Sequence, residues 1–159
     1  MSQQRWRLDG QLALVTGGSA GIGRAIAREL LGFGARVLIA ARDGNGLDAV
    51  RIELEEEFPD GEVRTCVADV ADDEQRRELL DWVEDIGDGL NILVNNAGGN
   101  LTKAAIDYSE DEWRGIFEVN LFSAFELARS TYPLLTKHAA SCIVNVGSGG
   151  SYLPVANAT

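Results

Sequence analysis

The stretch Leu12-Ala13-Leu14-Val15-Thr16-Gly17-Gly18-Ser19-Ala20-Gly21-Ile22-Gly23 decides the fold of this 159-residue chain. A short apolar run, typical of a buried strand, leads through glycines spaced G-x3-G-x-G into a segment of helical periodicity that runs to about residue 33. A tight turn needs a residue free in φ, and a phosphate close to the backbone needs a residue without Cβ. The helix N-terminus adds unpaired N–H groups and positive partial charge. The stretch therefore predicts a pyrophosphate-binding turn; the alternative is a glycine-rich turn without a ligand.

The same alternation of apolar runs and helical segments continues along the chain. No Gly-Lys-Ser/Thr follows the glycines, which excludes a Walker-type triphosphate loop. Repeated strand–helix units indicate a parallel sheet covered on both faces, and right-handed crossovers favour a doubly wound, Rossmann-like α/β fold in one domain over residues 1–159. The expected strands are 12–15, 37–40, 63–70, 90–94 and 142–146, and the expected helices are 21–33, 47–58, 72–86 and 109–137.

Composition narrows the function classes. With 14 basic and 25 acidic residues the net charge is −11, which argues against a nucleic-acid partner. No apolar run approaches the roughly 18 residues of a membrane helix, and no leader marks the chain for export. Cys66 and Cys142 lie in apolar runs, so we expect buried free thiols and a cytoplasmic location. No cluster of residues has metal-ligand spacing, so we expect no metal site.

The end of the second expected strand indicates the cofactor. An NAD site places Asp or Glu there to bind the ribose 2′-hydroxyl, but this strand ends Ala40-Ala41-Arg42. A guanidinium can bind a 2′-phosphate bidentately, so we predict NADP over NAD. The missing acid also argues against an S-adenosylmethionine methyltransferase. The alternative is that Arg42 is an ordinary solvated loop residue.

Three polar features follow later strands. Asn120 falls on the apolar stripe of the longest expected helix, where a buried amide must find partners, either in an active site or on a neighbouring strand. Asn95 and Asn96 close the fourth strand, as turn formers or as residues that hold loops around a ligand. Ser148 follows the fifth strand among glycines, where it binds a substrate oxygen or is an ordinary loop serine.

Together, the glycine stretch, Asn95-Asn96-Ala97-Gly98, Asn120-Leu121 and Ile143-Val144-Asn145-Val146-Gly147-Ser148 resemble the short-chain dehydrogenase/reductase family. The opening Arg5-Trp6-Arg7-Leu8 and Leu90-Asn91-Ile92-Leu93-Val94 are similar to its tropinone-reductase-like branch. The resemblance covers essentially the whole chain. It implies a small carbonyl or alcohol substrate, a homo-oligomer in the full-length form, Ser148 orienting the substrate carbonyl and Asn120 fixing a water in the proton relay. The cofactor-binding residues that the glycine loop, the strand ends and the resemblance together predict are Gly17, Ser19, Ala20, Gly21, Ile22, Gly23, Arg42, Asp69, Val70, Asn96, Ala97 and Gly98.

The chain departs from the family at its catalytic pair. The family's Tyr-x-x-x-Lys tyrosine follows the serine by about a dozen residues, whereas Tyr152 is too close to Ser148 and has no lysine four positions later. We therefore expect a Rossmann domain incomplete after its fifth strand and inactive by itself. The two hypotheses are the cofactor-binding portion of an NADP-dependent oxidoreductase, and a non-enzymatic module that binds a nucleotide weakly or self-associates through uncovered apolar faces.

Overall fold

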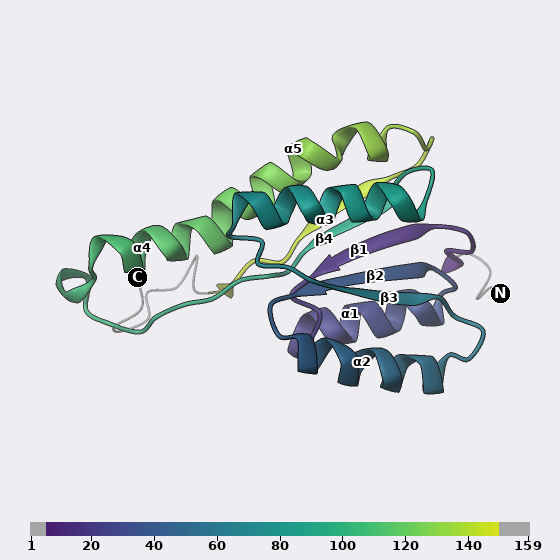
Figure 1. Ribbon diagram of the computed structural model, residues 1–159, viewed down its shortest axis with the longest axis horizontal. Coiled ribbons are helices and arrows are strands. Elements are labelled where there is room, and N and C mark those ends of the chain that lie inside the picture. Colours follow the sequence, from purple (N-terminus) through teal and green to yellow (C-terminus); the bar gives the residue numbers. More distant parts are fainter. Residues whose placement is uncertain (1–5, 150–159) are drawn as a thin grey trace.

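The computed structural model describes residues 6–149, which contain a five-stranded parallel sheet in the order β3-β2-β1-β4-β5. This confirms the predicted α/β class, and Figure 1 shows the sheet between two helical layers. The strands are β1 (Leu12–Thr16), β2 (Arg36–Ala41), β3 (Val63–Val67), β4 (Ile92–Asn95) and β5 (Cys142–Asn145). The helices are α1 (Gly21–Gly32), α2 (Gly44–Glu57), α3 (Asp73–Ile86), α4 (Glu110–Phe117) and α5 (Ser123–Leu135), with a 3-10 turn η2 (Ala105–Asp107) and a π-helical segment η3 (Glu118–Phe122).

The sheet divides the core into two layers, and its central strand β1 contributes side chains to both. Because successive side chains of a strand point to opposite faces, Ala13 and Val15 pack on the side of α1 and α2. Leu12 and Leu14 pack on the side of α3 and α5. All five residues of β1 are buried, as a central parallel strand requires, and its carboxyl end is therefore fixed in the middle of the sheet edge.

The prediction of one continuous helix over residues 109–137 is wrong, because three helical segments occupy this region. The π-helical segment η3 separates α4 from α5 and interrupts the helical register at Asn120. As Figure 1 shows, α5 lies over the sheet whereas α4 projects beyond it. The buried residues of this region are Ser123, Leu127, Thr131, Leu134 and Leu135, rather than the apolar stripe around Asn120 that the single long helix predicted.

The two cysteines are free thiols, as predicted, but neither is fully buried, contrary to expectation. Cys66 is half-buried, and its burial raises the pKa of the thiol. Cys142 is exposed because it lies on β5, at the edge of the sheet, where all four residues are exposed in the part of the chain that the structure describes. The expectation of a buried Cys142 was therefore wrong.

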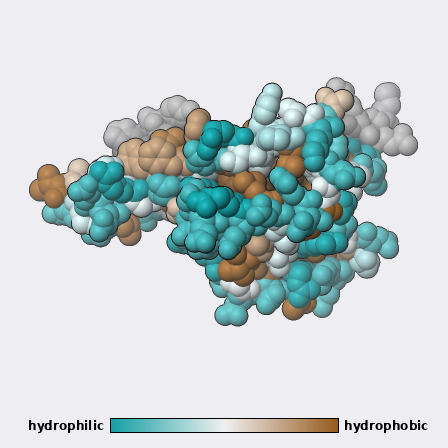
Figure 2. Space-filling model, turned by 45° about the horizontal axis from the view of Figure 1, so that its top comes forward, coloured by the Kyte–Doolittle hydropathy of each residue, from teal (hydrophilic) through white to brown (hydrophobic). Residues whose placement is uncertain are grey.

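Apolar side chains are also exposed along the helical arm formed by α4, η3 and α5, whose α4 end projects beyond the sheet. Phe117, Phe122, Phe125 and Tyr132 are between 48% and 65% exposed. Figure 2 shows apolar patches on this arm, whereas most of the visible surface of the body is hydrophilic. Within residues 6–149, no helix has the length and apolar character needed to cross a membrane.

Candidate functional site

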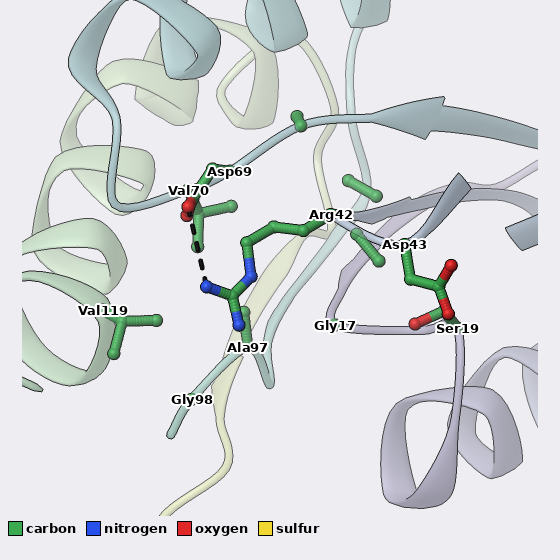
Figure 3. A pocket seen from close by; sticks show the side chains of 12 residues that line it. Gly17, Ser19, Arg42, Asp43, Asp69, Val70, Ala97, Gly98 and Val119 are labelled. Atoms are coloured by element: carbon green, nitrogen blue, oxygen red, sulfur yellow. Dashed lines mark ion pairs between the residues drawn. The ribbon is translucent and has the colours of Figure 1, made fainter. Parts of the chain in front are cut away.

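A pocket of about 600 Å³ lies at the carboxyl edge of the sheet. In a doubly wound sheet this edge is the usual ligand site, because the loops after neighbouring strands converge there. Figure 3 shows the lining residues, which come from the ends of β1, β2, β3 and β4 and from η3. They are Gly17, Ser19, Ala40, Ala41, Arg42, Asp43, Ala68, Asp69, Val70, Ala97, Gly98 and Val119.

The glycine loop closes one side of the pocket, and two of its glycines have positive φ. Gly17 has φ +66° and Gly21 has φ +55°, a backbone region that L side chains rarely adopt. A Cβ on Gly17 would also lie 2.8 Å from Ala97 Cα. The predicted tight turn between β1 and α1 therefore depends on glycine for conformational and steric reasons.

Gly23 is buried in the first turn of α1, where it allows the Asn96 side chain and the Gly17 carbonyl to lie close to the helix. A Cβ there would lie 2.4 Å from both Asn96 Nδ2 and the Gly17 carbonyl oxygen. Asn96 uses that amide to donate hydrogen bonds to the carbonyls of Thr16 at 2.9 Å and Gly17 at 3.1 Å. Asn96 thus joins the loop after β4 to the glycine loop, while its predicted role around a ligand stays a prediction.

Thr16 completes this junction, and the sequence analysis assigned it no role. Its Oγ1 accepts hydrogen bonds from the backbone N–H groups of Asn96 at 3.1 Å and Ala97 at 3.0 Å. The same hydroxyl donates to the Val94 carbonyl at 3.3 Å. A threonine at the last position of a strand looks like an ordinary β residue, so only the pairing of β1 with β4 shows its function.

The N-terminus of α1 opens beside this loop without a competing side chain. Its N-cap residue, Ala20, provides no side-chain hydrogen bond, and the first turn contains no acidic residue. In contrast, Asp72 caps α3 and Ser109 caps α4. The first N–H groups of α1 are therefore available to an anion. Of the predicted residues in this turn, Gly17 and Ser19 line the pocket, whereas Ala20, Gly21, Ile22 and Gly23 do not.

Arg42 and Asp69 face each other across the pocket. The guanidinium Nη1 lies 3.7 Å from Asp69 Oδ2, and the Arg42 side chain is 73% exposed. Asp69 also shapes its own loop, because its Oδ1 accepts a hydrogen bond from the Ala71 N–H at 2.9 Å. In Figure 3 the Arg42 side chain extends from the end of β2 toward Asp69 and Val70, two predicted residues that line the opposite wall.

Asp43 is a pocket residue that the sequence analysis missed. It follows Arg42 directly, and Figure 3 shows its carboxylate turned toward Ser19 and away from the Arg42 guanidinium. The sequence prediction was based on the last residues of the second strand, Ala40-Ala41-Arg42, which include no Asp or Glu. The N-cap position of α2 brings this next residue into the pocket lining.

Asn120 lies beside the pocket but does not line it. Its Nδ2 donates to the Gly99 carbonyl at 2.7 Å, and its Oδ1 accepts from the Gly99 N–H at 3.1 Å. The amide therefore binds the loop after β4, a structural contact of the kind that the sequence left as the alternative. The side chain is exposed, so the expected buried position is wrong. Its neighbour Val119 lines the pocket, although it was not predicted.

Ser148 follows β5 and is exposed, outside the pocket lining. Tyr152, with which the catalytic-pair argument was concerned, lies outside the described residues. Among residues 6–149, no group of three or more His, Cys, Asp or Glu side chains is arranged to hold a metal ion.

Comparison with known proteins agrees with this architecture. The family model described as short chain dehydrogenase matches residues 11–159. A tropinone reductase homolog of Arabidopsis thaliana is 42% identical over 148 residues, which are 92% of this chain and 54% of that protein. Senescence-associated protein 13 of the same plant is 39% identical, over 95% of this chain and 56% of that protein.

Solved structures of other proteins have a similar fold. L-Sorbose reductase of Gluconobacter frateurii, complexed with NADPH and L-sorbose, has a TM-score of 0.90 and 29% identity, covering 94% of this chain and 57% of that one. A metagenomic short-chain oxidoreductase in complex with NADP has a TM-score of 0.88 and 34% identity, covering 95% of this chain and 68% of that one.

The fold defines a Rossmann-type α/β unit with a pocket at the carboxyl ends of its strands. More particularly, the chain belongs to the short-chain dehydrogenase family and is similar to its tropinone reductase homologs. It spans about half the length of the curated relatives that it matches.

Proposed function

We propose that this chain is the cofactor-binding portion of an NADP-dependent oxidoreductase that transfers hydride between the nicotinamide and a small carbonyl or alcohol substrate. The observation that carries the proposal is the strand-end pocket, which has a glycine cradle and an uncapped helix N-terminus on one side and Arg42 on the other. A Cβ at Gly17 would collide with Ala97, and one at Gly23 would collide with Asn96 and the Gly17 carbonyl, so both glycines keep the turn beside the pocket tight, and Gly17 itself lines the pocket through its backbone.

Each wall is suited to one part of the dinucleotide. Gly17, Ser19 and the first N–H groups of α1 would hold the pyrophosphate, together with Ala20, Gly21, Ile22 and Gly23. Arg42 would bind the 2′-phosphate of the dinucleotide. In the structure, the negatively charged partner of the Arg42 guanidinium is the Asp69 carboxylate. Asp69 and Val70 would contact the adenine, while Asn96, Ala97 and Gly98 form the central wall.

The bound cofactor supplies the hydride, and the polypeptide supplies binding and orientation. In this proposal Ser148 orients the substrate carbonyl, and Asn120 holds the loop after β4 and fixes a water of the proton relay. We expect no turnover from the chain by itself, because its sequence has no Tyr-x-x-x-Lys pair at the family's spacing after Ser148. We also propose a homo-oligomer for the full-length form and a cytoplasmic location, which the free thiols favour.

Titration of the chain with NADPH and with NADH tests this function. Arg42→Asp should weaken NADPH binding about 10- to 100-fold, because a charge-assisted hydrogen bond to phosphate is lost and a repulsive charge is introduced. NADH affinity should change little. Arg64→Asp is the matched control, since it makes the same charge change on β3 outside the pocket lining. An NADPH-to-NADH affinity ratio that is the same in the Arg42 variant and the unmodified chain would reject Arg42 as the phosphate ligand.

The second candidate is a non-enzymatic module that self-associates, and the exposed apolar side chains of the arm favour it. Phe117, Phe122, Phe125 and Tyr132 would be covered by another copy of the chain. Analytical sedimentation should then show oligomers that dissociate on Phe125→Asp, but not on Glu84→Lys on the exposed face of α3. A stable monomer at all concentrations would reject this candidate. Turnover of ketones by the chain with NADPH would instead reject the expectation that it is inactive.

A further inference from the structure

Arg76 is a buried cation outside the residues assigned so far. It lies in the second turn of α3, and its side chain is only 8% exposed. Arginine is rarely buried unless its charge is paired and its donors are hydrogen-bonded. Its adjacent residue on the same helix, Arg77, is 66% exposed, so the burial is specific to one position.

The partners of Arg76 come from two elements that border the pocket and from its own helix. Its Nη1 donates a hydrogen bond to the Val70 carbonyl oxygen at 2.5 Å. The same nitrogen lies 3.5 Å from Glu118 Oε1, at the start of η3, while Nη2 lies 3.4 Å from Asp73 Oδ1. Arg76 thus bridges the loop after β3 and the π-helical segment without itself lining the pocket.

In both bridged elements, the residue that Arg76 contacts either lines the pocket or is next to a residue that lines it. Val70 lines it directly, and Glu118 is followed by Val119, which lines it from the other side. The π-helical segment continues to Asn120, which is hydrogen-bonded to Gly99 of the loop after β4. The contacts therefore connect the loop after β3, the π-helical segment and the loop after β4, and Arg76 is the only charged member of this set that is buried among the described residues.

We propose that Arg76 is a positioning residue of the dinucleotide pocket, where it fixes the loop at Val70 against the π-helical segment at Glu118. The inference rests on the proposed function for its ligand. Removing the guanidinium leaves the Val70 carbonyl without its donor and releases Glu118 to solvent, so the two walls lose their fixed separation. The dinucleotide then has to order the walls when it binds, and its affinity falls.

The test compares NADPH affinity and nuclear magnetic resonance signals for matched variants. Arg76→Met should weaken NADPH binding about tenfold, as expected for a residue that acts through others. Arg77→Met, which removes an exposed charge from the same helix, should leave the affinity unchanged. Arg76→Lys should restore part of the loss, because it retains the charge but not the fork of donors.

A spectroscopic readout separates positioning from general destabilisation. The side-chain amide signals of Asn120 should shift in Arg76→Met and not in Arg77→Met, with no ligand present. Glu118→Gln should weaken binding in the unmodified chain and have no further effect in the Arg76→Met background, as a shared contact requires. If Arg76→Met does not fold, Arg76→Lys and Glu118→Gln provide the same comparison.

The outcomes distinguish failure of the proposed function from failure of the positioning role of Arg76. If the unmodified chain binds no NADPH, the proposed function fails, and the Asn120 signals alone decide whether the bridge exists. If the unmodified chain binds NADPH but folded Arg76→Met binds it equally well with unshifted Asn120 signals, the positioning role is overturned and the proposed function stands.

Discussion

Replacing Gly23 by alanine tests whether the contact between the glycine loop and Asn96 shapes the pocket. The added Cβ would lie 2.4 Å from Asn96 Nδ2 and 2.4 Å from the Gly17 carbonyl oxygen, so one or both must move by about 1 Å to reach ordinary contact. Asn96 cannot move freely, because the same amide is hydrogen-bonded to the Thr16 and Gly17 carbonyls. Overpacking of this kind costs about 1–3 kcal/mol, and loss of one of the two hydrogen bonds adds about 1 kcal/mol.

We therefore expect Gly23→Ala to lower the free energy of unfolding by about 2–4 kcal/mol in urea denaturation. At a temperature where the variant is folded, NADPH affinity should also fall at least tenfold, because a displaced Gly17 alters the turn that faces the pyrophosphate. Gly115→Ala is the matched control: it lies within α4 with nothing near its Cβ position, so it should stabilise the chain by about 0.5–1 kcal/mol. Equal stability and equal affinity for Gly23→Ala and the unmodified chain would refute the reasoning.

Two further perturbations probe charges. Asp43→Asn should raise NADPH affinity a few-fold and NADH affinity less, because it removes a negative charge from the pocket lining next to Arg42, although the carboxylate itself is turned toward Ser19; equal gains for both dinucleotides in the titration would contradict this. The hydrogen bond from Arg36 lowers the pKa of Glu62 below its usual value near 4.5, so the pair stabilises the chain at neutral pH and this stabilisation is lost as the pH falls through the folded-state pKa. Glu62→Gln should therefore cost about 0.5–1 kcal/mol at pH 7, since the pair is partly exposed, and almost nothing near pH 2. Urea denaturation of Glu62→Gln and of Glu84→Gln at both pH values makes the comparison; a cost for Glu62→Gln that is independent of pH would exclude the ion pair as its cause.

Local patterns were sufficient to predict the sheet and one side of the pocket. Apolar runs alternating with helical periodicity depend on which residues are next to one another, and they placed each strand within a few residues. The strand ends identified Gly17 and Arg42, and the family resemblance added Asp69; the structure brings all three to one pocket. They lie together because the carboxyl ends of parallel strands meet at one edge, whatever the details of their packing, while their binding roles stay predictions.

Predictions that required knowledge of packing failed. The helical stripe through Asn120 suggested a buried face, but a π-helical segment changes the register there and α4 extends beyond the sheet. Cys142 has an apolar neighbourhood in sequence and an exposed position in space, because β5 lies at the sheet edge. Periodicity reports which residues share a face, but not whether another element covers that face.

The fold class, the glycine turn and the basic residue at the end of β2 can be read from the sequence, because each depends on local conformation and on the order of elements. The junction of Thr16 and Asn96, the place of Asp43 in the pocket and the bridge made by Arg76 become visible only in three dimensions. Thr16 and Asn96 are 80 residues apart in the chain, and Arg76 and Glu118 come from different helical segments. Such contacts form only when the strands pair and the helices pack, so no local pattern of residues encodes them.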